Sequence, residues 1–433
     1  MLTNIVVPDS TAIAVAAVFI SLASTDGVSA QTLTDVIAAG QPLVSVRVRY
    51  ESVDQSNRSE SAQALTVRAR LGYQTGVFHG FSALAEFDLI DHLGAHTYCD
   101  TERDCVPAVY PVIADPDMAA LNRLQLNYAI PLSGSEMPDT TISFGRQRIV
   151  HGNQRFIGNV GWRQHEQTFD ALSIVSAALA DTTMSYSYVF QVNRIFGPDS
   201  VVQSALFDSN SHLFNVVYSG FQPHLRLESF AYLLDLEQGA TPTSPNNSLS
   251  SATYGLRGNG SFQLAEGFNL IYAGTYAHQT DFAQNPASLS LDYWQLEGGI
   301  SYDGFSAGIG YEILGSNGAR GFATPLATLH AFQGWADVFP ATPNQGIEDV
   351  FVKAGYRFSA KPVFSNVTLA IVYHDYSAEN VSADYGDEWD FLIEANFLEK
   401  VTSGIKFASY RTSGASPAPF DRKIFWLYLQ YVY

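Results

Sequence analysis

The C-terminal segment Phe425-Trp426-Leu427-Tyr428-Leu429-Gln430-Tyr431-Val432-Tyr433 carries the pattern that decides the fold. Apolar or aromatic side chains occupy every odd position, and the chain ends inside the pattern on an aromatic residue. A period of two is that of a β-strand, whose successive side chains point to opposite faces. A last strand has an open edge that must be paired, and we expect it to pair with the first strand. A soluble edge strand that ends in Tyr is the alternative.

The same alternation recurs along the chain from Leu43 onward. In residues 43–51 valines alternate with serine and arginine, and residues 65–73, 350–358 and 389–397 repeat the arrangement. Each segment has one apolar and one polar face over the ~9 to 11 residues that a tilted transmembrane strand requires. An antiparallel sheet in a soluble protein also alternates, so the period alone does not place the chain in a membrane.

Connection lengths give further evidence. Long connections, such as residues 92–117 and 316–346, alternate with tight ones at Ala180-Asp181, Asp303-Gly304 and Leu398-Glu399-Lys400. The predicted strands are eighteen in number and cover residues 43–51, 62–74, 79–91, 118–130, 139–149, 166–178, 182–194, 210–219, 224–236, 251–263, 267–279, 289–302, 305–315, 347–358, 364–376, 386–397, 401–411 and 422–433. An even number of strands with short periplasmic turns and long extracellular loops is typical of bacterial outer-membrane barrels. The C-terminal segment resembles the terminal strand by which the barrel assembly machinery recognises such proteins. We therefore predict one all-β domain over residues 31–433, a transmembrane antiparallel up-and-down β-barrel without a separate plug domain.

Composition excludes several other classes of protein. Of the 433 residues, 15% are charged and 13% aromatic, and 33 are glycines, a mixture that suits short strands and turns. After residue 30 there is no apolar run of the ~20 residues that a transmembrane helix needs. The formal net charge of −19 repels nucleic acid, so we expect no nucleic-acid partner.

The first thirty residues are predicted to be a secretory signal peptide. An apolar stretch from Ala12 to Leu22 is followed by the small-residue exit Val28-Ser29-Ala30. No Lys or Arg precedes Arg47, which departs from the usual cationic start of a signal peptide. A membrane anchor is the alternative, although the apolar stretch is short for crossing a bilayer.

The chain has two cysteines, Cys99 and Cys105. Their close spacing in an exported protein favours a disulfide that closes a small loop. His92 and His96 lie nearby, so a metal site is the alternative, but the spacings match no standard zinc pattern. We expect a disulfide, no metal and no cofactor.

Two blocks of sequence carry a family resemblance. The first runs Gly145-Arg146-Gln147-Arg148-Ile149, Arg155-Phe156-Ile157-Gly158-Asn159-Val160-Gly161-Trp162-Arg163-Gln164 and Glu166-Gln167-Thr168-Phe169-Asp170-Ala171, preceded by Ala114-Asp115-Pro116-Asp117 and Leu121-Asn122. The second runs Gly310-Tyr311-Glu312, Leu314-Gly315, Phe322-Ala323-Thr324-Pro325-Leu326-Ala327-Thr328-Leu329-His330 and Phe332-Gln333-Gly334-Trp335-Ala336-Asp337. Together they resemble the alginate export family of outer-membrane porins. The resemblance implies a barrel with the strand number given above and an arginine-rich pore that passes a polyanionic uronate polymer outward. The long periplasmic turn of alginate exporters near the C-terminus is replaced here by Leu398-Glu399-Lys400, which argues against regulated polymer secretion.

Arginines gather on the inward faces of the first two strands, where the only acid is Glu51 at the rim. The predicted pore-lining or anion-binding residues are Arg47, Arg49, Arg68, Arg70, Arg123, Arg146, Arg148, Arg155, Arg163, Lys353 and Arg357. Guanidinium groups in a narrow, protein-walled pore favour anions. The alternative is that each arginine pairs with an acid across the wall. A turn at Thr75–His79, for example, would set Glu86 opposite Arg68 and Asp88 opposite Thr66.

Three local features lie outside the regular alternation of the strands. Phe144 and Arg146 have the same parity, so we expect a bulge at Gly145 or a strand that has left the bilayer there. Trp162 and Trp335 are predicted in loops, where they either fold inward and stack on sugar rings or, as such residues do more often, pack a loop in place. Acids concentrated in residues 92–118 and 377–388 either bind divalent cations shared with lipopolysaccharide or form a solvated surface.

The function predicted from these features is passive passage of anionic sugars, or of a polysaccharide such as alginate or uronate, through the outer membrane. Expected partners are outer-membrane lipid and lipopolysaccharide, the barrel assembly machinery and an anionic saccharide. An outer-membrane hydrolase is one alternative, but no nucleophile motif is present and the 10 histidines are scattered. A secreted β-sandwich that binds carbohydrate is the other, and it would bury the odd-numbered C-terminal residues.

Overall fold

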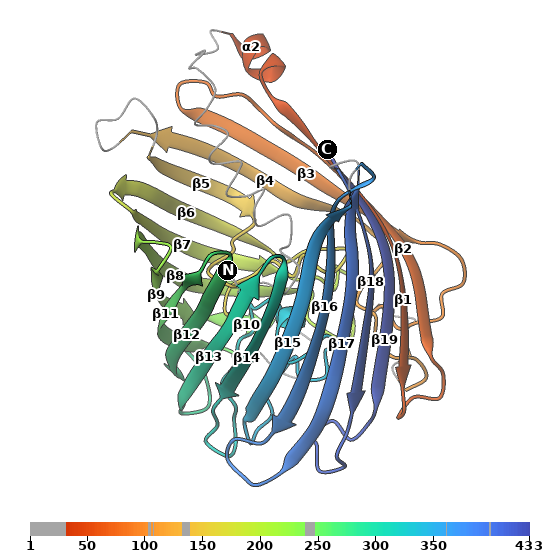
Figure 1. Cartoon of the computed structure of the whole chain (residues 1–433). Coiled ribbons are helices and arrows are strands. Elements are labelled where there is room, and N and C mark those ends of the chain that lie inside the picture. Colours follow the sequence, from red (N-terminus) through yellow and green to blue (C-terminus); the bar gives the residue numbers. More distant parts are fainter. Residues whose placement is uncertain are drawn as a thin grey trace.

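The computed structural model describes residues 32–102, 105–106, 108–131, 139–238, 247–360, 362–397 and 400–433. They form one antiparallel sheet in which each strand pairs with its neighbours and the last pairs with the first (Figure 1). The fold is a closed β-barrel, as predicted. The predicted signal peptide, residues 1–30, lies outside the described residues.

The barrel strands follow one another around the wall in chain order. They are β1 (Gln41–Gln55), β2 (Ala62–Gln74), β3 (Phe81–His92), β4 (Met118–Ile130), β5 (Thr140–Gln147), β6 (Thr168–Leu179), β7 (Thr182–Asn193), β8 (Leu206–Phe221), β9 (Leu225–Leu234), β10 (Leu236–Gln238), β11 (Ser251–Ala265), β12 (Phe268–Asp281), β13 (Ser290–Tyr302), β14 (Phe305–Leu314), β15 (Ile347–Ala360), β16 (Phe364–Ser377), β17 (Asp384–Phe397), β18 (Val401–Arg411) and β19 (Arg422–Val432). Because β10 continues β9 beyond Asp235 and both pair with β8, the described sheet of 19 strands makes 19 − 1 = 18 transmembrane strands. The predicted strand number is therefore confirmed.

The C-terminal strand closes the barrel. Tyr50 of β1 lies opposite Leu427 of β19, and Arg47 lies opposite Gln430. The amide of Tyr433 donates to the carbonyl of Val44 at 2.9 Å, which extends the pairing to the last residue. The edge of the last strand is therefore paired with the first strand, as expected.

Alternation along the strands separates an apolar exterior from a polar interior. The side chains of Leu429, Val352 and Ile393 are 48%, 52% and 53% exposed on the outside, whereas Arg49 and Glu388 are fully buried inside. In water such an exterior would aggregate, and in lipid it is the surface that a barrel requires. The chain is therefore an outer-membrane barrel, and the soluble β-sandwich alternative is excluded. Within the described ranges, no helix has both the length and the apolar character for a membrane span.

The two rims of the barrel differ. A short helix, α2 (Leu33–Ala38), lies at the same rim as the C-terminal end (Figure 1), and its Val36 carbonyl accepts from the amide of Gly76 at 2.9 Å. Tight turns such as Asp303-Gly304, where both residues have positive φ, connect strands at this rim. By the usual rule it is the periplasmic rim, and the long loops are extracellular.

Two sequence predictions about register were wrong. Arg68 lies opposite Ile90 rather than Glu86, because the pairing of β2 with β3 begins only at Gln74 and Leu84 and the connection is longer than a tight turn. Asp88 accordingly faces Arg70.

The expected bulge at Gly145 is also absent, since β5 keeps its register with both neighbours in the described pairing. Gly145 instead has a φ of +117°, a conformation that glycine adopts readily. An added Cβ there would lie 2.2 Å from the carbonyl oxygen of Leu124.

Candidate functional site

Two long loops fold into the barrel and meet. Loop β5–β6 covers residues 148–167, and loop β14–β15 covers residues 315–346 and contains the short 3-10 helix η1 (Leu329–Ala331). The amide of Gly158 donates to the carbonyl of Leu326 at 2.8 Å, and the amide of Thr328 donates to the carbonyl of Gln154 at 3.0 Å. The predicted long loops therefore do not simply cap the barrel, because together they span its lumen.

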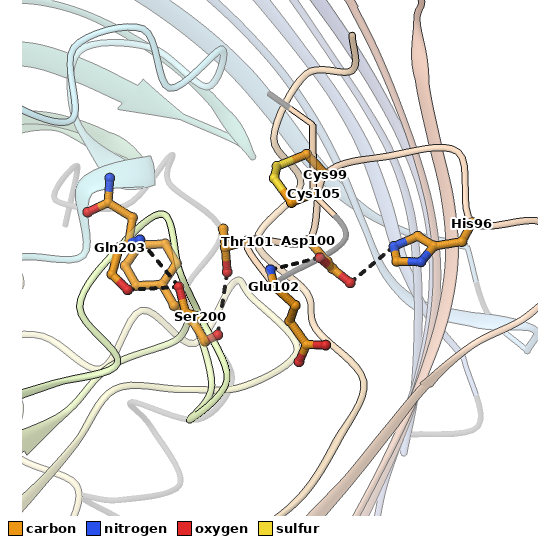
Figure 2. The surroundings of a disulfide bond; sticks show 9 residues. His96, Cys99, Asp100, Thr101, Glu102, Cys105, Ser200 and Gln203 are labelled. Atoms are coloured by element: carbon orange, nitrogen blue, oxygen red, sulfur yellow. Dashed lines mark hydrogen bonds and ion pairs between the residues drawn. A yellow bond between two sulfur atoms is a disulfide. The ribbon is translucent and has the colours of Figure 1, made fainter. Parts of the chain in front are cut away.

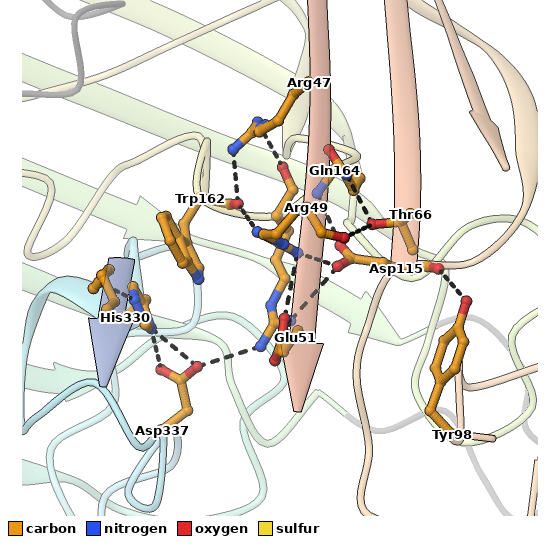
Figure 3. Close-up of polar contacts among 12 residues, drawn as sticks. Arg47, Arg49, Glu51, Thr66, Tyr98, Asp115, Trp162, Gln164, His330 and Asp337 are labelled. Atoms are coloured by element: carbon orange, nitrogen blue, oxygen red, sulfur yellow. Dashed lines mark hydrogen bonds and ion pairs between the residues drawn. The ribbon is translucent and has the colours of Figure 1, made fainter. Parts of the chain in front are cut away.

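Loop β5–β6 is held to the wall of β1 and β2 through its carbonyl oxygens. Arg47 donates to the carbonyls of Gly161 and Trp162, both at 3.0 Å. Arg49 also donates to the Trp162 carbonyl and pairs with Asp115, as Figure 3 shows. Arg68 reaches the carbonyl of Gln164 at 3.3 Å. The arginines of this wall therefore anchor a loop.

Most of the other predicted basic residues form ion pairs with acids. The ion pairs are Arg70 with Asp88 at 2.6 Å and Glu166 at 2.8 Å, Arg123 with Glu86 at 2.8 Å, Arg146 with Asp170 at 2.7 Å, Arg148 with Glu166, Arg155 with Glu312 at 2.7 Å, Arg163 with Glu51 at 3.0 Å, and Lys353 with Glu297 at 2.5 Å. For these residues the structure therefore shows the alternative considered from the sequence, in which each basic residue pairs with an acid. A buried guanidinium is stable only when it is paired and hydrogen-bonded, which is why the inward arginines find acids.

Loop β14–β15 is held in the opposite sense, through its amide groups. The amide of Trp335 donates to Asp390 at 3.1 Å, and that of Ala336 donates to Glu388 at 2.6 Å. Both acids are fully buried on the inner face of β17. This acidic anchor was not predicted from the sequence, although the inward parity of both acids in an alternating strand is visible there.

A cage of indole rings surrounds Lys406 of β18 where the two loops meet. Its Nζ lies 4.2 Å from the ring centre of Trp162, 3.9 Å from that of Trp335 and 5.4 Å from that of Trp426. The same ammonium lies 2.7 Å from Nε2 of His330. The two predicted loop tryptophans therefore do fold inward, and they pack against a lysine that the sequence analysis had not singled out.

His330 links this cage to the loops. Its Nδ1 is 3.1 Å from both carboxylate oxygens of Asp337, and Asp337 is 3.4 Å from Arg163 (Figure 3). Burial and the neighbouring Lys406 lower the pKa of His330 to about 4. Burial alone would raise the pKa of Asp337, but His330 and Arg163 lower it to about 2. At neutral pH a neutral His330 thus donates from Nδ1 to a charged Asp337 and accepts from Lys406 at Nε2.

A cavity of about 890 Å³ extends from the paired loops to the periplasmic turn Tyr302–Phe305. Its charged lining consists of the basic residues Arg47, Lys353, Arg357 and Lys406 and the acids Glu297, Asp303, Glu312, Asp349 and Glu394. Three of the predicted pore-lining residues, Arg47, Lys353 and Arg357, thus line it. The other eight predicted residues are not in its lining, because their ion pairs and carbonyl contacts hold them against the loops or at the rim. The predicted loop aromatics Trp162 and Trp335 both line the cavity.

Loop β3–β4, residues 93–117, packs over the extracellular side. Cys99 and Cys105 form a disulfide, and the neighbouring Thr101 contacts the carbonyl of Phe196 at 3.5 Å (Figure 2). Asp115, fully buried, accepts from the amide of Gln164 at 2.8 Å. This loop is therefore tied to loop β5–β6.

One group of side chains in the described part of the chain has donor atoms close enough to hold a metal ion. The donor atoms of Asp91, His92 and Asp117 lie within 4.8 Å of one another at the extracellular end of β3. His96, the second histidine considered at the sequence level, stacks on His92 with ring centres 5.0 Å apart and bonds Asp100 at 3.1 Å. The cysteines take no part in this group, because they are joined to each other.

Comparisons with known proteins agree on the fold. No protein-family model matches the sequence, and no curated protein matches it. The crystal structure of Pseudomonas aeruginosa OpdL is similar with a TM-score of 0.65 at 15% identity, covering 92% of this chain and 99% of OpdL. Acinetobacter baumannii OccAB4 is similar with a TM-score of 0.67 at 14% identity over 91% of this chain and 98% of OccAB4. The crystal structure of Pseudomonas aeruginosa OpdK with vanillate is similar with a TM-score of 0.65 at 11% identity, covering 91% of this chain and 98% of OpdK. The likeness is one of fold, and the resemblance to the alginate export family stays a prediction.

Proposed function

We propose that the chain is a passive outer-membrane channel for small anionic solutes, with sugar acids such as uronates as the substrate class. The observation that carries the proposal is the cavity of about 890 Å³ inside the barrel, which reaches the periplasmic turn and has four basic side chains in its lining. The proposal assigns the chain no catalytic role. Lipopolysaccharide and the barrel assembly machinery are its proposed partners in the membrane.

The size of the passage favours a monomer or a short oligomer over a polymer. The two inward loops meet in a parallel backbone bridge between Ile157 and Leu326, and both residues are fully buried. The cavity that they leave is in the range of ~300 to 1,000 Å³ that holds small molecules. OpdK, a barrel of similar fold, was crystallised with vanillate, which carries a single carboxylate. Passage of an intact alginate chain would require both loops to leave the lumen.

The preference for anions is expected to be moderate. Basic residues follow the cavity in depth, from Arg357, whose amide bonds the carbonyl of Gly304 in the periplasmic turn at 2.8 Å, to Lys406 at the loops. Several weak sites in series attract an anion and still release it. Arg357 makes no ion pair with any described residue, whereas acids such as Glu297 neutralise part of the lining.

The test is ion selectivity in planar bilayers. Purified protein under a salt gradient should give a reversal potential of the sign that anion permeation predicts. Added D-glucuronate should then reduce the chloride current more than an equal concentration of D-glucose. Cation selectivity, or equal effects of the two sugars, would overturn the proposed substrate class, and absence of conductance would overturn the channel.

A further inference from the structure

We infer that Lys406 and the indole N–H of Trp162 form a carboxylate-binding subsite at the inner end of the cavity. The inference rests on the proposed channel function and deepens it, because it names the group that distinguishes a sugar acid from a neutral sugar. The ligand is a small carboxylate, recognised through its charge and oxygen atoms.

The Lys406 ammonium is buried with unused hydrogen-bond donors. Its side chain is 3% exposed, and it has no salt bridge within 4.0 Å to any described carboxylate. An ammonium has three N–H donors, and the one hydrogen bond found for Lys406 is to Nε2 of His330 at 2.7 Å. A buried charge with unused donors is costly. Lys406 thus differs from the paired arginines of the opposite wall.

The surroundings of Lys406 contain further hydrogen-bond donors without acceptors. Nε1 of Trp162 and Nε1 of Trp426 are buried and have no acceptor among the described residues. Among the described acids that act on Lys406, Oδ1 of Asp390 is a buried acceptor without a hydrogen-bond partner, and the other oxygen of Asp390 accepts from the amide of Trp335. Asp390, Asp337 and Glu394 act on Lys406 at longer range. Trp426 is fully buried and does not line the cavity, whereas Lys406 and Trp162 do. A carboxylate that enters from the cavity therefore supplies acceptor oxygens to the ammonium of Lys406 and to the indole of Trp162.

Selectivity between ligands follows from the contacts of the Trp162 ring. The ring of Trp162 already carries His330 stacked at 4.8 Å and the guanidinium of Arg49 at 5.1 Å. Its faces are therefore occupied, and stacking of a sugar ring on it is not the basis of recognition. The subsite is expected to select for the carboxylate and to tolerate variation in the ring that bears it.

Both loops contribute to the subsite. Trp162 belongs to loop β5–β6, whereas His330 and Trp335 belong to loop β14–β15. An interaction network runs from Arg163 through Asp337 to His330. It places the acceptor Nε2 of His330 beside Lys406 and fixes the position of the ammonium. His330 and Asp337 are therefore positioning residues, and Lys406 is the group that contacts the ligand.

Tryptophan fluorescence tests the subsite separately from conductance. Of the 5 tryptophans, Trp162, Trp335 and Trp426 surround Lys406, and Trp294 and Trp389 are 48% and 42% exposed to lipid. In detergent-solubilised full-length protein carrying Trp294→Phe and Trp389→Phe, the remaining signal comes from the cage. We expect a saturable change with D-glucuronate and none with D-glucose.

Further substitutions in the protein that carries Trp294→Phe and Trp389→Phe test the subsite directly. Lys406→Met should weaken glucuronate binding by about tenfold or more, and Trp162→Phe, which keeps a ring and removes the N–H, should weaken it by about tenfold. Lys400→Met, in a periplasmic turn outside the cavity, is the control and should bind as the parent does. Folding of each variant is checked by heat-dependent mobility in gels. If Lys406→Met fails to fold, Trp162→Phe still decides.

The outcomes separate the two proposals. Unchanged glucuronate affinity in the folded variants, or an equal response to glucose, would overturn the subsite while anion-selective conductance still supports the channel. Cation-selective conductance in bilayers would overturn the proposed substrate class whatever the fluorescence shows. Binding lost in Lys406→Met and Trp162→Phe and kept in Lys400→Met supports the subsite.

Discussion

The indole of Trp162 lies flat on the imidazole of His330, with ring centres 4.8 Å apart and planes 3° from parallel. The two residues belong to different inward loops, one following β5 and the other following β14. Their contact, together with the ion pair between Arg163 and Asp337 at 3.4 Å, joins the loops across the lumen. The width of the passage is therefore set by this loop pair and not by the diameter of the barrel.

Trp162→Ala should loosen the loop pair. It removes the stack on His330 and the cation–π contact with Lys406, worth together about 2 to 3 kcal/mol in a desolvated site. Single-channel recordings should show a larger and noisier conductance. Trp294→Ala, on the lipid face, is the control and should conduct as the parent does. An unchanged conductance in Trp162→Ala would mean that the loops are held by their other contacts.

Acid should weaken the docking of loop β14–β15. Burial and Lys406 lower the pKa of His330 to about 4 from 6.5, so the undocked state binds a proton more readily between these values. Docking is then fully stable above pH 6.5 and loses about 3 kcal/mol as the pH falls to 4. Asp337, with a pKa of about 2, stays charged in this window. Channel noise should therefore increase as the pH is lowered from 6.5 to 4. The increase should be much smaller in His330→Gln. An identical pH response in that variant would show that His330 is not the group that titrates.

Arg155 and Glu312 should be strongly coupled. Their side chains are 1% and 3% exposed, 2.7 Å apart, and Arg155 also reaches Thr324 and Gln333. Arg155→Met leaves a buried carboxylate without its cation and should cost about 3 to 5 kcal/mol in unfolding free energy, measured by urea titration. The double variant Arg155→Met with Glu312→Leu should cost less than Arg155→Met alone. Additive costs would argue against a direct pair.

Selectivity should follow the lining of the cavity and not the number of arginines. Arg357→Gln removes a cation from the lining and should shift the reversal potential toward cation permeation. Arg146→Gln removes a cation that pairs with Asp170 at 2.7 Å, outside the lining, and should shift it much less. Val352→Thr, on the outer face, should not shift it. A larger shift in Arg146→Gln than in Arg357→Gln would mean that the arginines of the matched sequence block line the conducting path.

The disulfide should stabilise loop β3–β4 and not the barrel. It closes a loop between Cys99 and Cys105, for which loop entropy gives about 2 kcal/mol. The double change Cys99→Ser with Cys105→Ser should speed proteolysis within residues 93–117 and leave the unfolding midpoint of the barrel nearly unchanged. A large fall in that midpoint would show that the loop is part of the cooperative core.

The sequence by itself determined the barrel. A period of two is a local property, since neighbouring side chains of a strand point to opposite faces whatever the strand pairs with. It therefore gave the strand number, the lipid-facing positions such as Leu427 and Val352, and the closing role of the C-terminal segment. The alternation of β18 also places Lys406 on the inner face, so the sequence would have identified it if every inward basic residue had been counted as a candidate.

Only the tertiary structure decided what the inward residues do. Register depends on the length of each connection, so Arg70 and not Arg68 met an acid of β3. The inward path of the two loops depends on contacts between residues far apart in the chain, such as Trp162 with His330 and Trp335 with Asp390. Charge balance in a buried space then selected acids for the arginines and left Lys406 without an ion pair among the described residues. No local pattern encodes these choices, because each depends on which side chains the closed barrel brings together.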